Sequence, residues 1–145
     1  MTDPAERNKA VVRRYAEEIW NRGNLTALDE FVADDYVMRD PGLPDIVGPE
    51  GLREHIAVIR AAFPDHRLEI TGIIAEGDEV AWRWQMHGTH VGEFLGVLPT
   101  GRRVTMTGIA LYRLTDGKVV ERHGEADLLG LLEQLGAPLA ADVSS

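Results

Sequence analysis

The chain has 145 residues, a length typical of one ordinary domain with a real core. Hydrophobic residues make up 44% and charged residues 27%, as in globular proteins, and no apolar run is long enough to cross a bilayer. The net charge of −9 argues against a nucleic-acid partner, and the lack of cysteine excludes disulfides and thiolate metal sites. The charged N-terminal segment has no signal-peptide core, so we expect a cytoplasmic protein without a membrane partner.

Apolar residues at helical spacing predict three helices before residue 64. The first begins at Asp3-Pro4, an N-cap followed by proline at the first helical position, and ends at Gly23. A second, short helix is expected over residues 24–32. The third covers residues 48–63 and ends before Pro64. The residues expected to face the core from these helices are Val12, Tyr15, Ala16, Ile19, Leu25, Leu28, Phe31, Val32, Leu52, Ile56, Ile59 and Phe63.

After Pro64 the periodicity changes from helical to alternating, which predicts strands over residues 67–75, 79–90, 103–114 and 118–125. Two-residue hairpin loops are expected at 77–78 and 116–117. A last helix covers 128–135 with Asp127 as its N-cap, and residues 141–145 are expected to fray. Because no helix falls between strands, the chain predicts a single α+β domain, residues 1–145, with about three N-terminal helices against one face of a curved antiparallel sheet.

Several motifs resemble those of one family. Two neighbouring segments are similar to the signature of SnoaL-like polyketide cyclases, also called ester cyclases. They are Gly88-Thr89-His90-Val91-Gly92-Glu93-Phe94-Leu95-Gly96 and Pro99-Thr100-Gly101. Further matching segments are 40–42, 63–65, 116–121, 124–130 and 134–136, so the resemblance covers nearly the whole chain.

The resemblance implies the cone-shaped α+β fold of the nuclear-transport-factor-two superfamily, with an apolar pocket inside the sheet. Homodimers are common in that superfamily. SnoaL-like cyclases close a ring in anthracycline precursors by intramolecular aldol chemistry, without metal or organic cofactor. Such chemistry needs a base near an acidic carbon and donors for the developing oxyanion. We therefore expect a cofactor-free, homodimeric enzyme with a small, hydrophobic, polycyclic substrate.

The chain departs from the family pattern at the catalytic positions. Aligned from the Asp-Gly-Lys turn, the acid/base aspartate of the family falls on Gly124, which cannot carry a proton. The pocket histidine and glutamine of the family fall on Ala110 and Gly108. Asp40 remains as an ionisable group. The resemblance thus predicts the fold and the ligand class and leaves the catalytic group to be identified.

Four residues are candidates for acid/base catalysis: Asp40, His90, His123 and Glu125. His90 either faces the pocket mouth or hydrogen-bonds backbone within its tight turn. His123 is an imidazole on the last strand, a suitable general base unless the alternation points it to the opposite face. Glu125 acts only if a strand-end bulge turns it inward, and otherwise it is a solvated edge residue. Asp40 either faces the pocket or makes an Asx turn with the following Pro-Gly.

Two apolar stripes and an arginine are expected to line the pocket. In the second stripe, Gly108 and Ala110 are expected to leave room for a ligand. Arg122 shares strand parity with Gly124, so it could hold an enolate or carboxylate of the substrate, or pair with Glu125 or Asp40. The predicted substrate-binding residues are Trp82, Trp84, Met86, Phe94, Met106, Tyr112 and Arg122. The five histidines show no metal-ligand spacing, so no metal is expected.

The sequence thus leads to the hypothesis of a SnoaL-like cyclase that uses cofactor-independent acid/base catalysis. Two alternatives stay open. One is epoxide-opening cyclisation or epoxide hydrolysis on the same fold, which does not need the missing aspartate. The other is a non-catalytic small-molecule-binding module, which the residues at 108, 110 and 124 would fit. The substrate itself is not encoded in any motif, since specificity lies in cavity shape.

Overall fold

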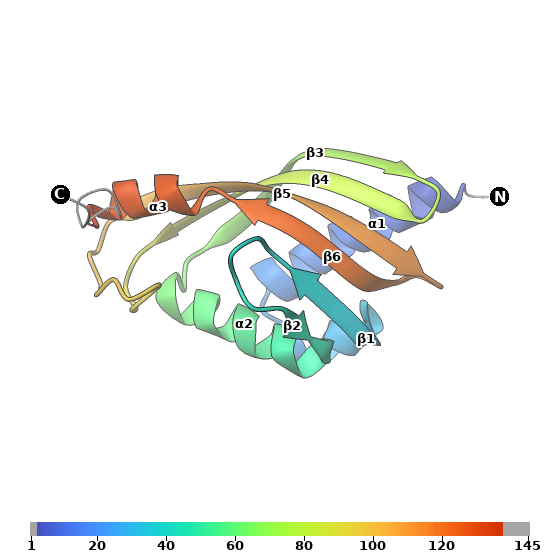
Figure 1. Cartoon of the computed structure of the whole chain (residues 1–145), viewed down its shortest axis with the longest axis horizontal. Helices are drawn as coiled ribbons and strands as arrows, with labels where there is room; N and C mark the ends of the chain where they lie inside the picture. The colour runs from blue at the N-terminus through green and yellow to red at the C-terminus, as the bar shows by residue number, and fades with distance from the viewer. Residues whose placement is uncertain (1–2, 138–145) are drawn as a thin grey trace.

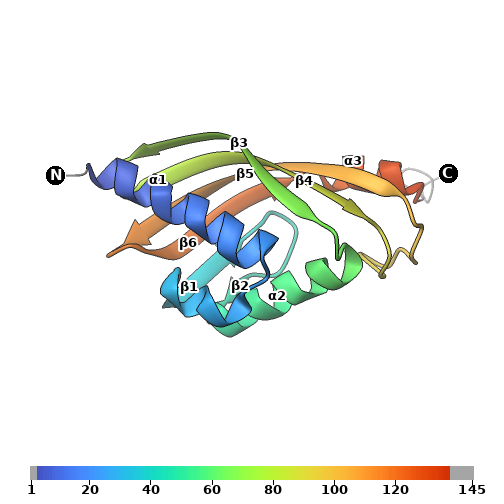
Figure 2. The same cartoon turned by 180° about the vertical axis from the view of Figure 1, so that it is seen from behind.

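The computed structural model describes residues 3–137 as a curved, unclosed sheet with helices on its concave side (Figures 1 and 2). Six strands lie in the order β2-β1-β6-β5-β4-β3. Four of them are the predicted strands: β3 (Arg67–Glu76), β4 (Glu79–Thr89), β5 (Arg103–Thr115) and β6 (Lys118–Ala126). They form three antiparallel pairs joined in chain order, which confirms the predicted α+β class. The end predicted to fray, residues 141–145, lies outside the described residues.

Two strands were not predicted, and they make the sheet mixed. Strand β1 (Val32–Arg39) pairs with β6 in parallel and with the short β2 (Ile46–Val47) in antiparallel orientation. The expected second helix is accordingly a single 3₁₀ segment, Leu25–Glu30, and Val32 belongs to the strand that follows. Asp34 and Asp35 interrupt the alternation of β1, and its register with β6 shifts between Val32 and Val37, so no clean period of two was visible.

The helices follow the apolar spacing of the sequence. Helix α1 (Pro4–Tyr15) has the predicted N-cap, because the Asp3 carboxylate accepts a hydrogen bond from the backbone N–H of Ala5 at 3.3 Å. Helix α2 (Gly48–Ala62) ends before Pro64 as expected. Helix α1 packs on β3 and β4, and α2 packs on β1 and β2. Helix α3 (Leu128–Leu135) is capped by Asp127, which accepts from the N–H of Gly130.

A π-helical segment, Ala16–Asn21, continues α1 where the sequence predicted ordinary helix. In a π-helix the hydrogen bonds join residues five apart, so Tyr15 and Trp20 are brought to the same side of the helix. The indole Nε1 of Trp20 donates to the hydroxyl of Tyr15 at 3.1 Å. The segment therefore turns two large aromatic side chains toward the inside of the sheet.

The alternation of β4 and β5 decides what faces inward. Along β5, residues 104, 106, 108, 110, 112 and 114 are buried, and the residues between them are exposed or half-buried. On β4 the inward residues are Val80, Trp82, Trp84 and Met86. Within residues 3–137 no helix has the length and apolar character that spanning a bilayer requires.

Candidate active site

A cavity of about 940 Å³ lies between the concave face of the sheet, the end of α1 with its π-helical extension, and α2. Such a volume suits a drug-sized or polycyclic ligand. All seven predicted substrate-binding residues line it: Trp82, Trp84, Met86, Phe94, Met106, Tyr112 and Arg122. The third tryptophan of the chain, Trp20, lines it too. Most of the wall is apolar, so the few polar groups on it stand out.

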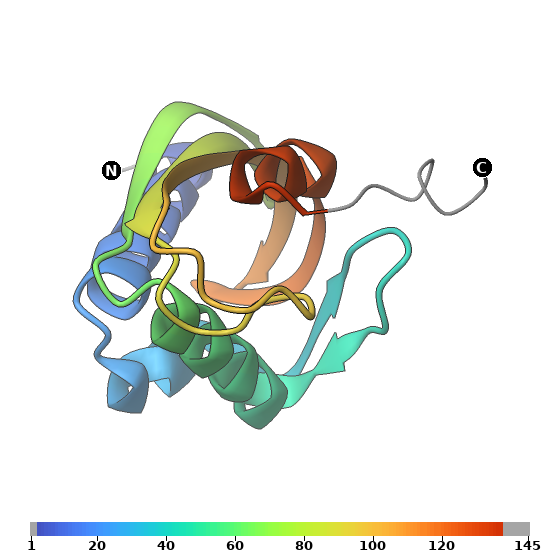
Figure 3. The same cartoon turned by 90° about the vertical axis from the view of Figure 1, so that its left-hand side faces the viewer.

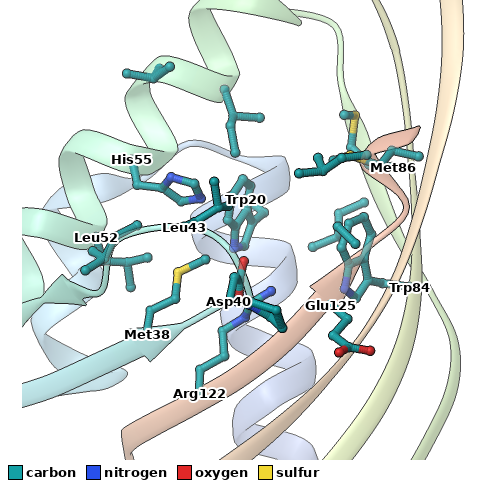
Figure 4. Close-up of a pocket in the computed structure, with 18 of the residues that line it drawn as sticks. Trp20, Met38, Asp40, Leu43, Leu52, His55, Trp84, Met86, Arg122 and Glu125 are labelled. Atoms are coloured by element: carbon teal, nitrogen blue, oxygen red, sulfur yellow. The ribbon is translucent and has the colours of Figure 1, made fainter. Parts of the chain in front are cut away.

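The most prominent polar group is an ion pair between Asp40 and Arg122. Arg122 Nη1 donates to Asp40 Oδ1 at 2.5 Å. The Asp40 side chain is 17% exposed and the Arg122 side chain is 9% exposed. The parallel pairing of β1 with β6 sets Met38 opposite Arg122, so Asp40, just after β1, reaches the guanidinium. Oδ2 of Asp40 has no hydrogen-bond partner among the described residues, and the carboxylate borders the cavity. Figure 4 shows the pair in the middle of the site.

The arginine reaches this position because residue 124 is glycine. A Cβ placed on Gly124 would lie 2.5 Å from Arg122 Cζ and 2.6 Å from Nη1. The guanidinium therefore lies over the backbone where the side chain of an aspartate would begin. The sequence shows only that the family's carboxylate is missing at 124. The structure shows what fills its space, an arginine that binds another carboxylate.

The expectation that Gly108 leaves room for a ligand is wrong. The indole ring of Trp84 lies directly over Gly108, and a Cβ there would overlap it. Gly108 pairs with Trp84 across the β4–β5 ladder, so the missing side chain of one strand is replaced by the large side chain of the next. Ala110, on β5 opposite Trp82, is buried and is not among the residues that line the cavity.

Three buried tyrosines surround the same region: Tyr15, Tyr36 and Tyr112. Burial raises the pKa of each, so their hydroxyls stay protonated and can act as neutral donors. Burial by itself would lower the pKa of Arg122. Its neighbours Tyr112 and Asp40 outweigh that effect and raise the pKa, so the guanidinium stays charged. The site thus combines one fixed cation, one carboxylate and neutral phenols.

His55 is a cavity residue that the sequence analysis did not propose. It projects from α2, opposite the Trp84 and Met86 wall (Figure 4). Burial, with a smaller contribution from Arg122, lowers the pKa of His55, so the imidazole is neutral at neutral pH. Neither ring nitrogen has a hydrogen-bond partner among the described residues. Its position three residues after Leu52 and four before Ile59 was the signal that places it on the inward face.

Of the other three catalytic candidates, His90 and His123 do not line the cavity, and Glu125 lies at its border. His90 is fully buried, its Nδ1 lies 3.0 Å from Thr100 Oγ1 and accepts from the N–H of Thr100, and it does not line the cavity. His123 lies on the outer face of β6, is 53% exposed and contacts Glu121 at 3.2 Å. Glu125 borders the cavity but is exposed, since the strand alternation continues through it. The structure therefore brings Asp40 together with Arg122, keeps Glu125 at the border of the same cavity, and leaves His90 and His123 outside it.

The rim of the cavity is formed partly by the segment between β4 and β5. Glu93, Phe94 and Leu95 line the cavity from this segment. Its backbone is held to the end of α2 because the N–H groups of Val91 and Gly92 donate to the carbonyl of Ala62. Figure 3 shows the segment crossing in front of the concave side of the sheet, between α2 and α3. Within residues 3–137 no three carboxylate or histidine side chains come together as a metal site.

A curved sheet around an apolar cavity, closed by helices and carrying a few ionisable groups, is the architecture of the nuclear-transport-factor-two-like class. A family model for SnoaL-like polyketide cyclases matches residues 10–135 of this chain. The match begins within α1 and runs through all six strands to the end of α3. The chain belongs to the SnoaL-like polyketide cyclase family.

Two relatives and one solved structure illustrate the similarity. The aklanonic acid methyl ester cyclase DauD of Streptomyces sp. (strain C5) is 33% identical over 133 residues, 88% of this chain and 81% of that protein. The nogalonic acid methyl ester cyclase of Streptomyces nogalater is 32% identical over 127 residues, 85% of this chain and 93% of that protein. A crystal structure from Jannaschia sp. CCS1, assigned as SnoaL-like, has a TM-score of 0.86 and 26% identity, covering 96% of this chain and 98% of that one.

Proposed function

We propose that this cyclase closes a ring in a polyketide-derived, fused-ring ester, and that Asp40 moves the proton. The observation that carries the proposal is the Asp40–Arg122 pair on the wall of the apolar cavity, in the place of the missing aspartate at 124. The substrate class follows from the relatives, which act on methyl esters of aklanonic and nogalonic acid. A cytoplasmic location and a homodimer, both expected from the sequence, stay predictions.

The chemistry is a proton transfer followed by carbon–carbon bond formation. The Asp40 carboxylate takes a proton from a carbon flanked by two carbonyl groups, and the enolate carbon attacks a ketone of the same molecule. The new alkoxide then takes a proton back from the Asp40 carboxylic acid. Substrate and product are isomers, so no other reactant is consumed.

The neighbours of Asp40 supply the stabilisation that this step requires. Arg122 carries further N–H donors beyond the one that holds Asp40, and a fixed cation beside the reacting carbon stabilises an enolate oxygen. Protonated hydroxyls of Tyr15 and Tyr112 add neutral donors nearby. The neutral imidazole of His55 offers an N–H to a second carbonyl of the substrate from the α2 side. An apolar wall strengthens each of these interactions by excluding water.

Asp40→Asn tests the assignment. We expect kcat for ring closure of aklanonic acid methyl ester to fall about 100-fold or more, because the amide keeps the shape but cannot accept the proton. The product is measured by chromatography and mass spectrometry as an isomer of unchanged mass. Asp35→Asn is the matched control, since Asp35 is exposed on β1, the strand that precedes Asp40, and it should leave turnover intact.

The same assay separates the alternatives. Turnover of an epoxide of similar shape, with no turnover of the ketone, would contradict the aldol route and favour epoxide opening. Saturable binding of both compounds without any product would favour a binding module. Full activity in the Asp40→Asn variant would remove Asp40 from the mechanism.

A further inference from the structure

A tight turn at the cavity rim has an unfavourable residue in it. Phe94 and Val97 form an isolated antiparallel bridge, with the N–H of each donating to the carbonyl of the other at 3.1 and 2.9 Å. The two residues between them, Leu95 and Gly96, both have positive φ, 51° and 78°. Positive φ at both central positions is the signature of a type I′ turn, which favours Asn-Gly or Asp-Gly.

Leucine is a poor residue for the first position of such a turn. Its Cβ crowds the backbone at positive φ, and it has no short polar group that bonds locally. Among the described residues only one other non-glycine has positive φ, Asp116 at 51°, and it is followed by Gly117 at 78°. Asp116-Gly117 has the preferred composition for the same geometry. The Leu95-Gly96 turn and the Asp116-Gly117 turn therefore share one backbone geometry, and they differ in that leucine is strained in it whereas aspartate suits it.

Burial of the Leu95 side chain does not compensate for this strain. Leu95 is 49% exposed, although it borders the cavity together with Phe94. The Phe94 ring packs against the Phe63 ring, with ring centroids 5.4 Å apart, and this contact anchors the turn to the end of α2. An apolar side chain that is strained and half exposed at the mouth of an apolar cavity becomes buried when a ligand fills that cavity.

We infer that Leu95 is a substrate-contacting residue that sets affinity, and that the Phe94–Val97 turn accepts backbone strain in order to hold this side chain over a bound ring system. The inference deepens the proposed function, because it rests on the cavity binding a planar polycyclic compound. It assigns Leu95 to binding and gives it no part in proton transfer.

The test compares Leu95→Asn with the unaltered protein in stability and in binding. Asn suits the first position of a type I′ turn, so the melting temperature should rise by about 2–4 °C. The apolar contact is lost, so Kd for 1-hydroxyanthraquinone should rise about tenfold. Binding is followed by quenching of tryptophan emission, since all three tryptophans, Trp20, Trp82 and Trp84, line the cavity. N-acetyltryptophanamide corrects for light absorbed by the probe.

Asp116→Leu is the reciprocal control. It places leucine in the same turn geometry far from the cavity lining, so the melting temperature should fall while Kd stays unchanged. A Leu95→Asn variant with unchanged Kd would overturn the inference, and so would one with a lowered melting temperature. If the unaltered protein shows no saturable quenching, the proposed substrate class fails as well, which distinguishes the two failures.

Discussion

At the scale of single residues, Gly124 explains more of this site than any side chain that lines it. A glycine on the inner face of a strand leaves a gap beside its neighbours. Here the gap is filled by the Arg122 guanidinium, which then binds Asp40. A substitution at position 124 should therefore affect the Asp40 carboxylate through Arg122, although Gly124 itself makes no hydrogen bond to Asp40.

Gly124→Ala should weaken catalysis without unfolding the protein. The new Cβ would lie 2.5 Å from Arg122 Cζ, and the flexible end of the arginine must move away. Loss of its hydrogen bond to Asp40 should lower kcat/KM by roughly 10- to 100-fold, the value of a charge-assisted hydrogen bond. Steady-state kinetics measure the loss, and circular dichroism checks the fold. Unchanged kinetics would mean that the arginine's position over Gly124 is irrelevant to turnover.

At the scale of elements, strands β4 and β5 share one packing arrangement. Large residues on β4 cover small residues on β5, so Trp84 lies over Gly108 and its ring still forms part of the cavity wall. A predicted stripe of small residues on one strand therefore does not predict empty space, because its partner strand supplies the volume. This is why the expectation for Gly108 failed while the expectation for Trp84 on the wall was met.

Gly108→Ala should lower the free energy of unfolding by about 1–3 kcal/mol, the usual cost of overpacking. The added Cβ meets the Trp84 ring and lies 2.9 Å from the carbonyl oxygen of Glu125, and neither can move freely. Urea denaturation followed by circular dichroism gives the change. Gly72→Ala is the matched control on β3, since its Cβ would make only ordinary contacts at 3.9 Å and should cost little. Equal stability of the two variants would contradict this account of the packing.

At the scale of the whole molecule, all three tyrosines are buried in one core. Burial raises their pKa above the ordinary value of 10.0. The folded state therefore holds more protons than the unfolded state above pH 10.0, so stability must fall as the pH rises through that value. The effect is fully absent at neutral pH, where both states are protonated.

Spectrophotometric titration of tyrosinate tests whether the buried tyrosines stay protonated until the protein unfolds. We expect no tyrosinate absorbance in the folded protein just above pH 10.0, and then a steep rise that coincides with loss of the circular-dichroism signal. The chain in concentrated guanidinium should titrate smoothly near 10.0. Reversible ionisation of one or more tyrosines with the fold intact would show that the hydroxyls around Arg122 are open to water.

Much of the fold follows from local pattern. The helical spacing and the proline before β3 defined α1 and α2, and strict alternation defined β3 to β6 and their hairpin loops. These signals are local because a helix or a strand buries a face whose period is set by its own backbone. Strand β1 was not predicted, because two aspartates break its alternation and β6, its parallel partner, is more than eighty residues away in the chain. The family resemblance led to the correct family, which the comparisons confirm.

The sequence by itself therefore determined the class of fold, the family and the residues that alternate toward the inside, including Trp82, Trp84 and Arg122. Only the tertiary structure decided which ionisable groups meet there. Asp40 reaches Arg122 through a parallel pairing between strands distant in the chain, and His55 enters from a helix packed across the cavity. Local periodicity says which way a side chain points, whereas the distance between two side chains depends on how whole elements pack.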